Sequence, residues 1–504
     1  MKSNFTAICL LVSLALLLCG LPHVFSQQVS ADAAEESTQQ QAWEACKAAL
    51  EAKGEHMDLA WFNPPPVPDD KNFALTPLLK PLLDYTVDPK THTYVFSDPD
   101  PPVKKISVYI EGATADNPSS KSWETGHARN LEALQVYYRA SLPGMTLSKS
   151  APEDVLAVLS RFDAMFAELR REMQARPLCR YPVHYELGMS RPLPHLTVIR
   201  DMVRVLSSRA SAMLALNHPD EAFADLEFGF RLSDTIRDEP GLIPGLVDAV
   251  MATTLLQAVW EGIAAHRWND AQLATLEKEL QRLDFLSDFD RGMRYERVSG
   301  IGQLQNGSKD PNGLAGLDLK RFGLKNVTSP PLGGPAYRAA IYRNQIVYST
   351  MIQAQFLGIM DEKGQTVNVT RAREAQKAFD EMQVSPSNFL AKALMQSYAS
   401  VAKKFSRMQT YTNLGAAGCE IERYRLAHDK LPATLDALHM PALPHDVING
   451  EPLHYRLEGD GNYLLYSVGW NEKDDGGKIV VNAKGFIDDQ ASEQGDWVWS
   501  LKPL

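Results

Sequence analysis

The chain has 504 residues, of which 44% are hydrophobic and 22% charged, and its formal net charge is −11. This composition is typical of globular proteins and excludes a disordered or fibrous chain. The acidic balance and the absence of a long lysine or arginine run argue against nucleic acid or an anionic membrane surface as a partner.

Residues 1–26 predict an export signal. Lys2 precedes an apolar run from Ala7 to Leu18, and Ser26 offers a small residue at a cleavage site. The run is about a dozen residues long, whereas about 20 are needed to cross a bilayer. The alternatives are an uncleaved N-terminal anchor and a lipoprotein attached through Cys19. We therefore expect a periplasmic or secreted protein with no membrane span after signal removal.

Signal removal leaves three cysteines, Cys46, Cys179 and Cys419, with no CxxC pair among them. That number is too small for a disulfide scaffold and the spacing does not fit a zinc site. We interpret them as buried structural thiols, the alternative being a single disulfide with one cysteine left over.

The next 122 residues of the sequence, 27–148, divide into a leader and a proline-rich segment. Residues 27–40 are polar and lack apolar periodicity, so we expect a flexible leader. Residues 41–148 predict a Pro-rich α/β segment, with a short helix at 41–53 and a strand at 103–110. The prolines between positions 64 and 68 enforce an extended rod. This rod either crosses its own domain as a strap or docks on an aromatic groove of a partner.

Residues 149–400 predict a helical body. Six apolar residues follow one another at spacings of 4, 3, 4, 3 and 4, which places them on one helix face: Val155, Leu159, Phe162, Phe166, Leu169 and Met173. Ser150 and Glu153 form a capping box before them. The helix expected at 243–265 is apolar nearly all round, so it should be central. Residues 299–335 are rich in Gly, Asn and Pro and predict an irregular loop.

Residues 401–504 predict a small α+β unit. A helix at about 398–428 is followed by a hairpin whose turn lies at 459–462, then by an acidic loop at 471–477 and a last strand at 478–482.

This C-terminal order resembles the globular head of type II secretion major pseudopilins. The resemblance covers roughly residues 415–480 and rests on these positions: Tyr424, His428, Leu431-Pro432, Leu435, Leu438, Pro444, Asp446, Gly450, Pro452, Tyr455, Tyr466-Ser467-Val468-Gly469 and Asp475-Gly476-Gly477. Residues 218–234 are similar to a tetratricopeptide-type helix. A helical middle with such a tail resembles a group of exported bacterial proteins of unknown function.

The resemblance implies a calcium site in the acidic loop. Asn471, Asp474 and Asp475, joined by Asp488 or Asp489, match the calcium-binding loop of those pseudopilins in position. Grouped oxygen ligands in a Gly-rich loop suit Ca²⁺. The alternative is a solvated turn in which Asp and Gly serve the backbone geometry.

Catalytic motifs are absent from the sequence: it contains no HExxH, GxSxG, GxxxxGK[ST] or GxGxxG. Cys179, His184, Glu186 and His195 come close together in the sequence, but prolines interrupt their segment, so a structural role is favoured. The acid pairs Asp288/Asp290 and Glu227/Asp234 could form a glycosidase-like dyad, a pattern that any acidic chain offers. We assign no catalytic residue.

The sequence thus predicts a mainly α fold of stacked antiparallel helices, with a Pro-rich N-terminal α/β segment and a small C-terminal α+β unit. For function it favours a non-enzymatic scaffold or protein-binding protein of the bacterial cell envelope, with an unidentified protein partner and no cofactor other than calcium. The alternative is an envelope hydrolase with a site between the helical body and the 299–335 loop. Such an enzyme should show a deep cleft with convergent histidine and carboxylate groups of shifted pKa.

Overall fold

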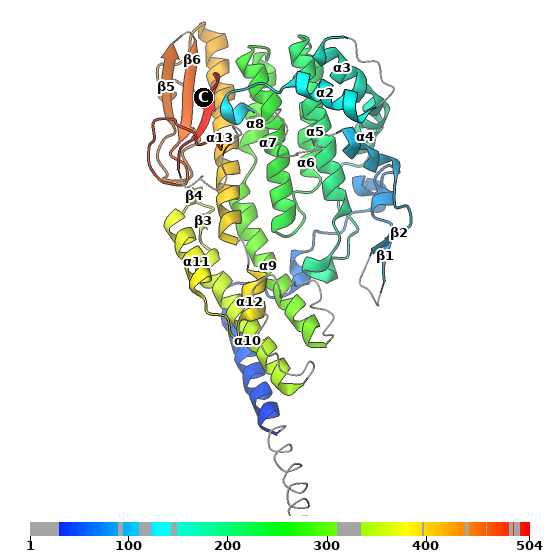
Figure 1. Ribbon diagram of the computed structural model, residues 1–504, viewed down its shortest axis with the longest axis vertical. Helices are drawn as coiled ribbons and strands as arrows, with labels where there is room; N and C mark the ends of the chain where they lie inside the picture. The colour runs from blue at the N-terminus through cyan, green and yellow to red at the C-terminus, as the bar shows by residue number, and fades with distance from the viewer. Residues whose placement is uncertain are drawn as a thin grey trace, which may run out of the picture.

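Figure 1 shows the computed structural model of the chain. It describes residues 30–88, 94–109, 122–142, 149–309, 334–395, 398–438, 443–459, 461–482, 487 and 494–504. The described residues form a mainly α-helical fold with small antiparallel sheets, as the sequence predicts. The export signal lies outside the described residues.

A layer of long helices standing side by side occupies the centre of the molecule (Figure 1). Its members are α5 (Pro194–Ala215), α6 (Pro219–Asp234), α7 (Leu242–Ala264), α8 (Asp270–Gln281), α9 (Phe285–Lys309) and α13 (Tyr398–His428). Because short connections join α5, α6 and α7, these three helices alternate in direction. The sequence-based expectation that the apolar helix is central is confirmed, since α7 contacts α5, α6, α9 and α13.

Within the described residues, α7 is the one helix that is long and apolar enough to cross a membrane, judged by length and composition alone. Of its most apolar stretch, 61% is buried inside the protein. An apolar surface on all sides is also what a helix needs when other helices surround it.

Three shorter helices cover one flank of this layer: α2 (Leu131–Ser141), α3 (Ala151–Leu159) and α4 (Asp163–Ala175). A 3₁₀ turn, η8 (Ser160–Phe162), joins α3 to α4, so the helix expected as one piece has a break in it. The predicted capping box is present, with the Ser150 N–H donating to Glu153 Oε2 at 3.1 Å. The predicted apolar stripe faces the core, where Val155, Phe166 and Leu169 are fully buried.

The N-terminal segment begins with a helix over residues 30–51, which therefore includes most of the segment expected to be a flexible leader. Its Glu36 forms an ion pair with Arg338, which explains how an alanine- and glutamate-rich stretch is held as helix. The following elements are short: η1 (Leu59–Phe62), η2 (Asp69–Lys71), η3 (Phe73–Leu75), η4 (Lys80–Leu82), β1 (Tyr85–Val87), β2 (Tyr94–Phe96), η5 (Pro102–Tyr109) and η7 (Trp123–Thr125).

The strand expected at 103–110 was wrong, because residues 102–109 form η5. Val103 and Ile106, three residues apart, are both buried, a spacing that one face of a helix satisfies and an alternating strand does not. Contact with α5 provides that buried side.

The proline-rich rod lies against its own chain. Pro64, Pro65 and Val67 form one wall of a groove of about 460 Å³ whose other walls include Leu178 and Thr235. Of the two interpretations of this rod, the structure therefore favours the internal strap.

The lower end of the molecule in Figure 1 consists of short elements beside the N-terminal helix. They are α10 (Pro335–Met351), a π-helical turn η12 (Ile352–Phe356), the pair β3 (Met360–Asp361) and β4 (Thr366–Val367), α11 (Val369–Glu381) and α12 (Phe389–Leu394). The irregular loop expected at 299–335 begins later than expected, because α9 continues to Lys309. Residues 310–333 lie outside the described residues.

The C-terminal unit is an antiparallel sheet packed on α13, preceded by the turn η13 (Leu435–Ala437). Its order is β5 (His454–Gly459), β6 (Asn462–Ser467) and β7 (Trp497–Ser500), so the predicted hairpin is confirmed. The last strand was misplaced, because residues 478–482 contribute only an isolated bridge at Val481 and the third strand is β7. Fully buried Trp499 explains this pairing: it packs on Gly415 and Gly418 of α13, where a Cβ at Gly418 would lie 2.9 Å from its Nε1.

Candidate functional site

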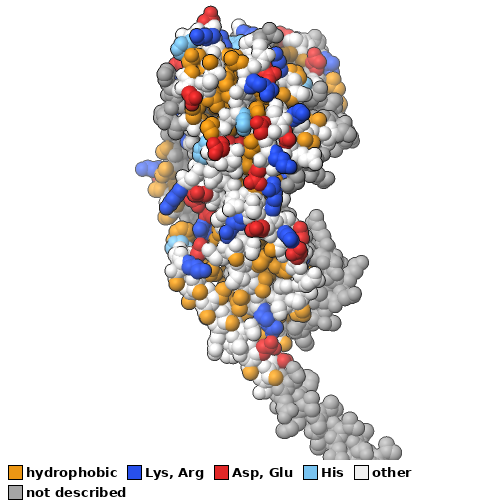
Figure 2. All heavy atoms as spheres, turned by 90° about the vertical axis from the view of Figure 1, so that its left-hand side faces the viewer, with side chains coloured by type: hydrophobic (Ala, Val, Ile, Leu, Met, Phe, Trp, Pro, Cys, Tyr) orange, Lys and Arg blue, Asp and Glu red, His pale blue; other side chains and the backbone are white. Residues whose placement is uncertain are grey.

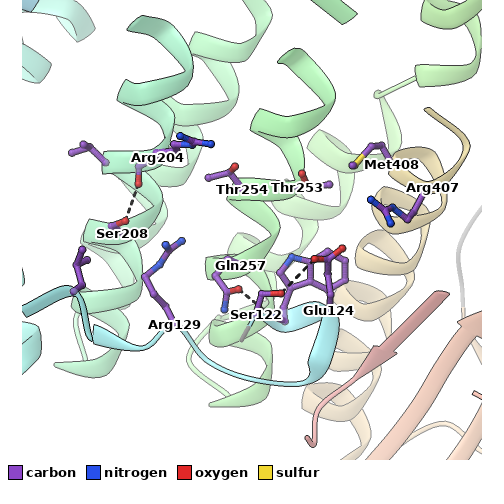
Figure 3. Close-up of a pocket in the computed structure, with 13 residues that line it drawn as sticks. Ser122, Glu124, Arg129, Arg204, Ser208, Thr253, Thr254, Gln257, Arg407 and Met408 are labelled. Atoms are coloured by element: carbon purple, nitrogen blue, oxygen red, sulfur yellow. Dashed lines mark hydrogen bonds between the residues drawn. The ribbon is translucent and has the colours of Figure 1, made fainter. Parts of the chain in front are cut away.

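A pocket of about 350 Å³ opens between α5, α7 and α13 (Figure 3). We call it the arginine pocket, and its described lining is Ser122, Trp123, Glu124, Arg129, Leu134, Arg204, Val205, Ser208, Thr253, Thr254, Gln257, Arg407 and Met408. Three guanidinium groups and one carboxylate are the charges in this lining. The described wall of the pocket is therefore electropositive, although the whole chain is acidic.

Arg129 is held by α5. Its Nε donates to Ser211 Oγ at 3.2 Å and its Nη2 donates to Ser207 Oγ at 3.0 Å. The backbone N–H of Arg129 donates to Glu261 Oε1 on α7 at 2.7 Å, which fixes the loop that carries the side chain. Within the described part of the chain, the Arg129 guanidinium contacts hydroxyls and forms no ion pair, so its positive charge is not neutralised there.

Arg204 is a residue of α5, and 34% of its side chain is exposed. Burial lowers its pKa, and the positive charges of Arg200 and Arg129 lower it further, whereas Asp201 acts in the opposite direction. Asp201 is 3.9 Å from Arg204 but lies closer to Arg200, at 3.2 Å. Arg204 therefore shares its counter-ion and keeps a net positive environment.

The α7 wall of the pocket is polar. The hydroxyls of Thr253 and Thr254 donate to backbone carbonyls of their own helix, which leaves their oxygen lone pairs as acceptors. Gln257 connects this wall to the floor, because its Oε1 accepts from the backbone N–H of Trp123 at 2.9 Å and its Nε2 donates to the carbonyl of His127.

The third side comes from α13. Figure 3 shows Arg407 and Met408 across the pocket from Arg129 and Arg204. Arg407 is only 9% exposed, so its guanidinium lies at the protein interior rather than in bulk solvent. The pocket thus places guanidinium groups on two opposite sides of a space the size of a small ligand.

No protein-family model, no curated protein and no solved structure matches this chain. The kind of ligand that the pocket binds is therefore inferred from the residues that line it. The guanidinium groups are the part of this lining that binds oxygen-rich anions, because Thr253, Thr254 and Gln257 already donate their hydrogens within the protein.

The acidic C-terminal loop holds its side chains in a network of internal hydrogen bonds. Asn471 Nδ2 donates to Asp475 Oδ2 at 2.8 Å, and Asp474 Oδ1 accepts from the Gly476 N–H at 2.8 Å. Burial raises the pKa of Asp496 to about 6, an effect that the nearby Asp475 and Asp474 reinforce. Across the described residues, no group of three or more His, Cys, Asp and Glu side chains is placed to hold a metal ion. Asp488 and Asp489 lie outside the described residues, so calcium in this loop stays a prediction.

Cys179 and His195 lie against the same buried residue, Tyr181, whereas His184 lies apart from them. His184 is on the surface, with its Nδ1 2.8 Å from Glu186 Oε1. His195 is completely buried and stacks on Tyr181 with a ring separation of 3.8 Å. Burial raises the pKa of Cys179 to about 12, which favours the protonated thiol over the thiolate.

His195 belongs instead to a buried polar cluster that sequence reasoning missed. Its Nε2 is 4.0 Å from Glu239, which also accepts a hydrogen bond from Tyr185 at 2.9 Å. Burial lowers the pKa of His195 to about 3 and raises that of Glu239 to about 7. Arg191 lies 3.9 Å from Glu239 and completes the cluster. None of these residues lines the arginine pocket.

The acid pairs considered for a glycosidase-like dyad are engaged with arginines. Asp288 pairs with Arg291 at 2.8 Å, and Asp290 pairs with Arg294. Asp234 pairs with Arg282 at 2.6 Å, whereas Glu227 lines a separate shallow groove of about 180 Å³ with Arg170 and Arg231. Three of these four acids are therefore paired with arginines, and burial raises the pKa of Asp288 to about 7 against the effect of Arg291.

Proposed function

We propose that this chain is an exported binding or scaffold protein of the bacterial cell envelope, which holds a ligand in the arginine pocket and does not turn it over. The composition of the pocket carries this proposal. Its described lining has three arginines and several hydroxyls but a single carboxylate, Glu124, and no histidine. General acid–base catalysis needs a proton donor and acceptor of suitable pKa beside the substrate, and arginine is too basic for that role.

The positions of two groups with strongly shifted pKa, Glu239 and His195, support the same proposal. Glu239 and His195 are buried in the cluster near Tyr185, and neither of the two lines a described pocket. We infer that they serve the packing of the body. The rival hydrolase would use a site between the helical body and residues 299–335, of which the structure describes residues 299–309 in α9 and residues 334–335.

Export and a protein contact complete the proposal. The apolar run at Ala7–Leu18 supports a periplasmic or secreted location. The pseudopilin-like C-terminal unit is our candidate for contact with a partner protein. Figure 2 shows hydrophobic side chains on the surface of the side that faces left in Figure 1, where the C-terminal sheet lies. The exposed hydrophobic residues of this unit include Leu426, Leu457 and Val481.

The test is ligand retention by pocket-filling variants. Ser208 lines the pocket, so Ser208→Trp should fill it, whereas Ser160→Trp places the same side chain on an exposed turn. The exported full chain and both variants are isolated under mild conditions and weighed by native mass spectrometry. We expect one ligand per chain in the wild type and in Ser160→Trp, and none in Ser208→Trp. Equal retention by both variants, or no ligand in any of the three proteins, would contradict the proposal.

A further inference from the structure

We propose that the arginine pocket binds a tetrahedral dianion, the phosphate or sulfate group of a small ligand. This inference rests on the proposed function, because it names the ligand class of the same pocket.

The charge of the pocket calls for an anion. Arg129 donates to two serine hydroxyls, and the carboxylate nearest Arg204, Asp201, is shared with Arg200. Asp201 Oδ2 also accepts a hydrogen bond from the Ser107 hydroxyl at 2.6 Å, so one of its carboxylate oxygens is engaged outside the pocket lining. Glu124 supplies one negative charge for three guanidinium groups, and a bound dianion would offset the positive charge that remains in this partly buried space.

The directions of the donors select a tetrahedral group. Arg129 and Arg204 approach from α5 and the loop before α2, while Arg407 lies on the opposite wall (Figure 3). A carboxylate is planar and is typically bound in two parallel bonds by one guanidinium. A phosphate or sulfate presents oxygens in several directions, so the guanidinium groups of Arg129 and Arg204, which come from different segments, can bind it at once.

The rest of the wall suits the body of such a ligand. Thr253 and Thr254 offer hydroxyl oxygens, and Val205 and Met408 offer apolar surface beside them. A cavity of about 350 Å³ exceeds the space that a single oxyanion needs, so the dianion is expected to be part of a larger molecule.

The test is calorimetric titration of the exported full chain at low ionic strength with inorganic phosphate, sulfate and acetate. Arg204→Gln removes one pocket guanidinium, and Arg231→Gln is the matched control on the exposed surface of α6. We expect phosphate and sulfate to bind one per chain. Losing one charge-assisted contact should weaken binding by about tenfold or more in Arg204→Gln, with less than about a twofold change in Arg231→Gln. Arg204→Lys, which keeps the charge but loses the fork geometry, should give an intermediate affinity.

Three results would overturn the inference: acetate binding as tightly as phosphate, equal loss in Arg204→Gln and Arg231→Gln, or no binding of either dianion. Circular dichroism of each variant verifies that it is folded. A wild-type chain that ignores all three anions, yet retains a ligand that Ser208→Trp loses, overturns this inference and leaves the proposed function standing.

Discussion

At the scale of single residues, interactions between neighbours in the sequence could be predicted, whereas interactions between distant segments could not. The Ser150–Glu153 capping box was predictable because both partners lie within one turn of helix. Arg129, Arg204 and Arg407 come from segments far apart in the chain, and nothing in their neighbours distinguishes them from surface arginines. Only the packing of α5 and α13 on α7 brings them to one pocket.

The buried Glu239 should make the stability of the protein depend on pH. Its folded pKa of about 7 lies above the usual value of 4.5, so the unfolded chain loses this proton first as the pH rises. The folded state binds more protons between these two values, and stability should therefore fall with rising pH across that window. Across the whole window, the free energy of unfolding should fall by an amount of the order of 3 kcal/mol.

Glu239→Gln should remove most of this dependence while keeping an oxygen that can accept from Tyr185. Urea unfolding of both proteins at pH 5 and pH 8 measures the effect. The free energy of unfolding of the wild type should drop more between these pH values than that of the variant. Parallel changes in the two proteins would show that Glu239 is not the group responsible.

At the scale of elements, the spacing of hydrophobic residues predicted the long helices. It failed where contacts between distant segments determine the secondary structure. The pattern at 103–110 alternates like a strand, yet contact with α5 selects a 3₁₀ helix. The third strand was assigned to residues 478–482 because the pairing of β7 depends on the fit of Trp499 against α13, which a local pattern does not reveal.

One element links the arginine pocket to the C-terminus. The turn η7 lines the pocket with Trp123, whose ring packs against Trp499 of β7 at 5.3 Å. The backbone N–H of Leu504 donates to the carbonyl of Thr125, and the next residue, Gly126, has a φ of +70°. A Cβ at Gly126 would lie 1.9 Å from the Lys502 carbonyl oxygen. The C-terminus therefore fits on η7 only because residue 126 is glycine.

Gly126→Ala should displace the C-terminus from η7 and destabilise the protein. Gly461→Ala is a matched control, because Gly461 has the same φ of +70° but nothing within 4 Å of its Cβ position. The backbone strain common to both is about 1–2 kcal/mol. The clash should add a further ~1–3 kcal/mol in Gly126→Ala alone. Denaturant unfolding compares them, and equal losses in the two variants would mean that the Lys502 contact contributes nothing.

At the scale of the whole molecule, the class of fold was predictable because it depends on composition and period, which are properties of long stretches. The domain boundary expected at residue 401 falls inside a helix, because α13 starts at Tyr398. This helix contacts both the body helices and the C-terminal sheet. The sequence signals two units there because the strand pattern begins only after the helix ends.

Calcium in the acidic loop should stabilise the C-terminal unit if the pseudopilin resemblance extends to metal binding. Thermal unfolding of the exported chain with calcium and with a chelator measures this, and the chelator should lower the midpoint. Asp475→Asn removes one of the proposed ligand charges and should make the midpoint insensitive to the chelator. An unchanged midpoint for the wild type would reject the calcium site.

The most direct test of the central claim is the fate of the ligand in the arginine pocket. The ligand that is released from the isolated wild-type chain is returned to fresh protein in excess, incubated overnight and weighed again by mass spectrometry. We predict an unchanged ligand mass and saturation at one ligand per chain. A product that accumulates beyond one equivalent with the wild type, but not with Ser208→Trp, would show turnover in this pocket and contradict the account.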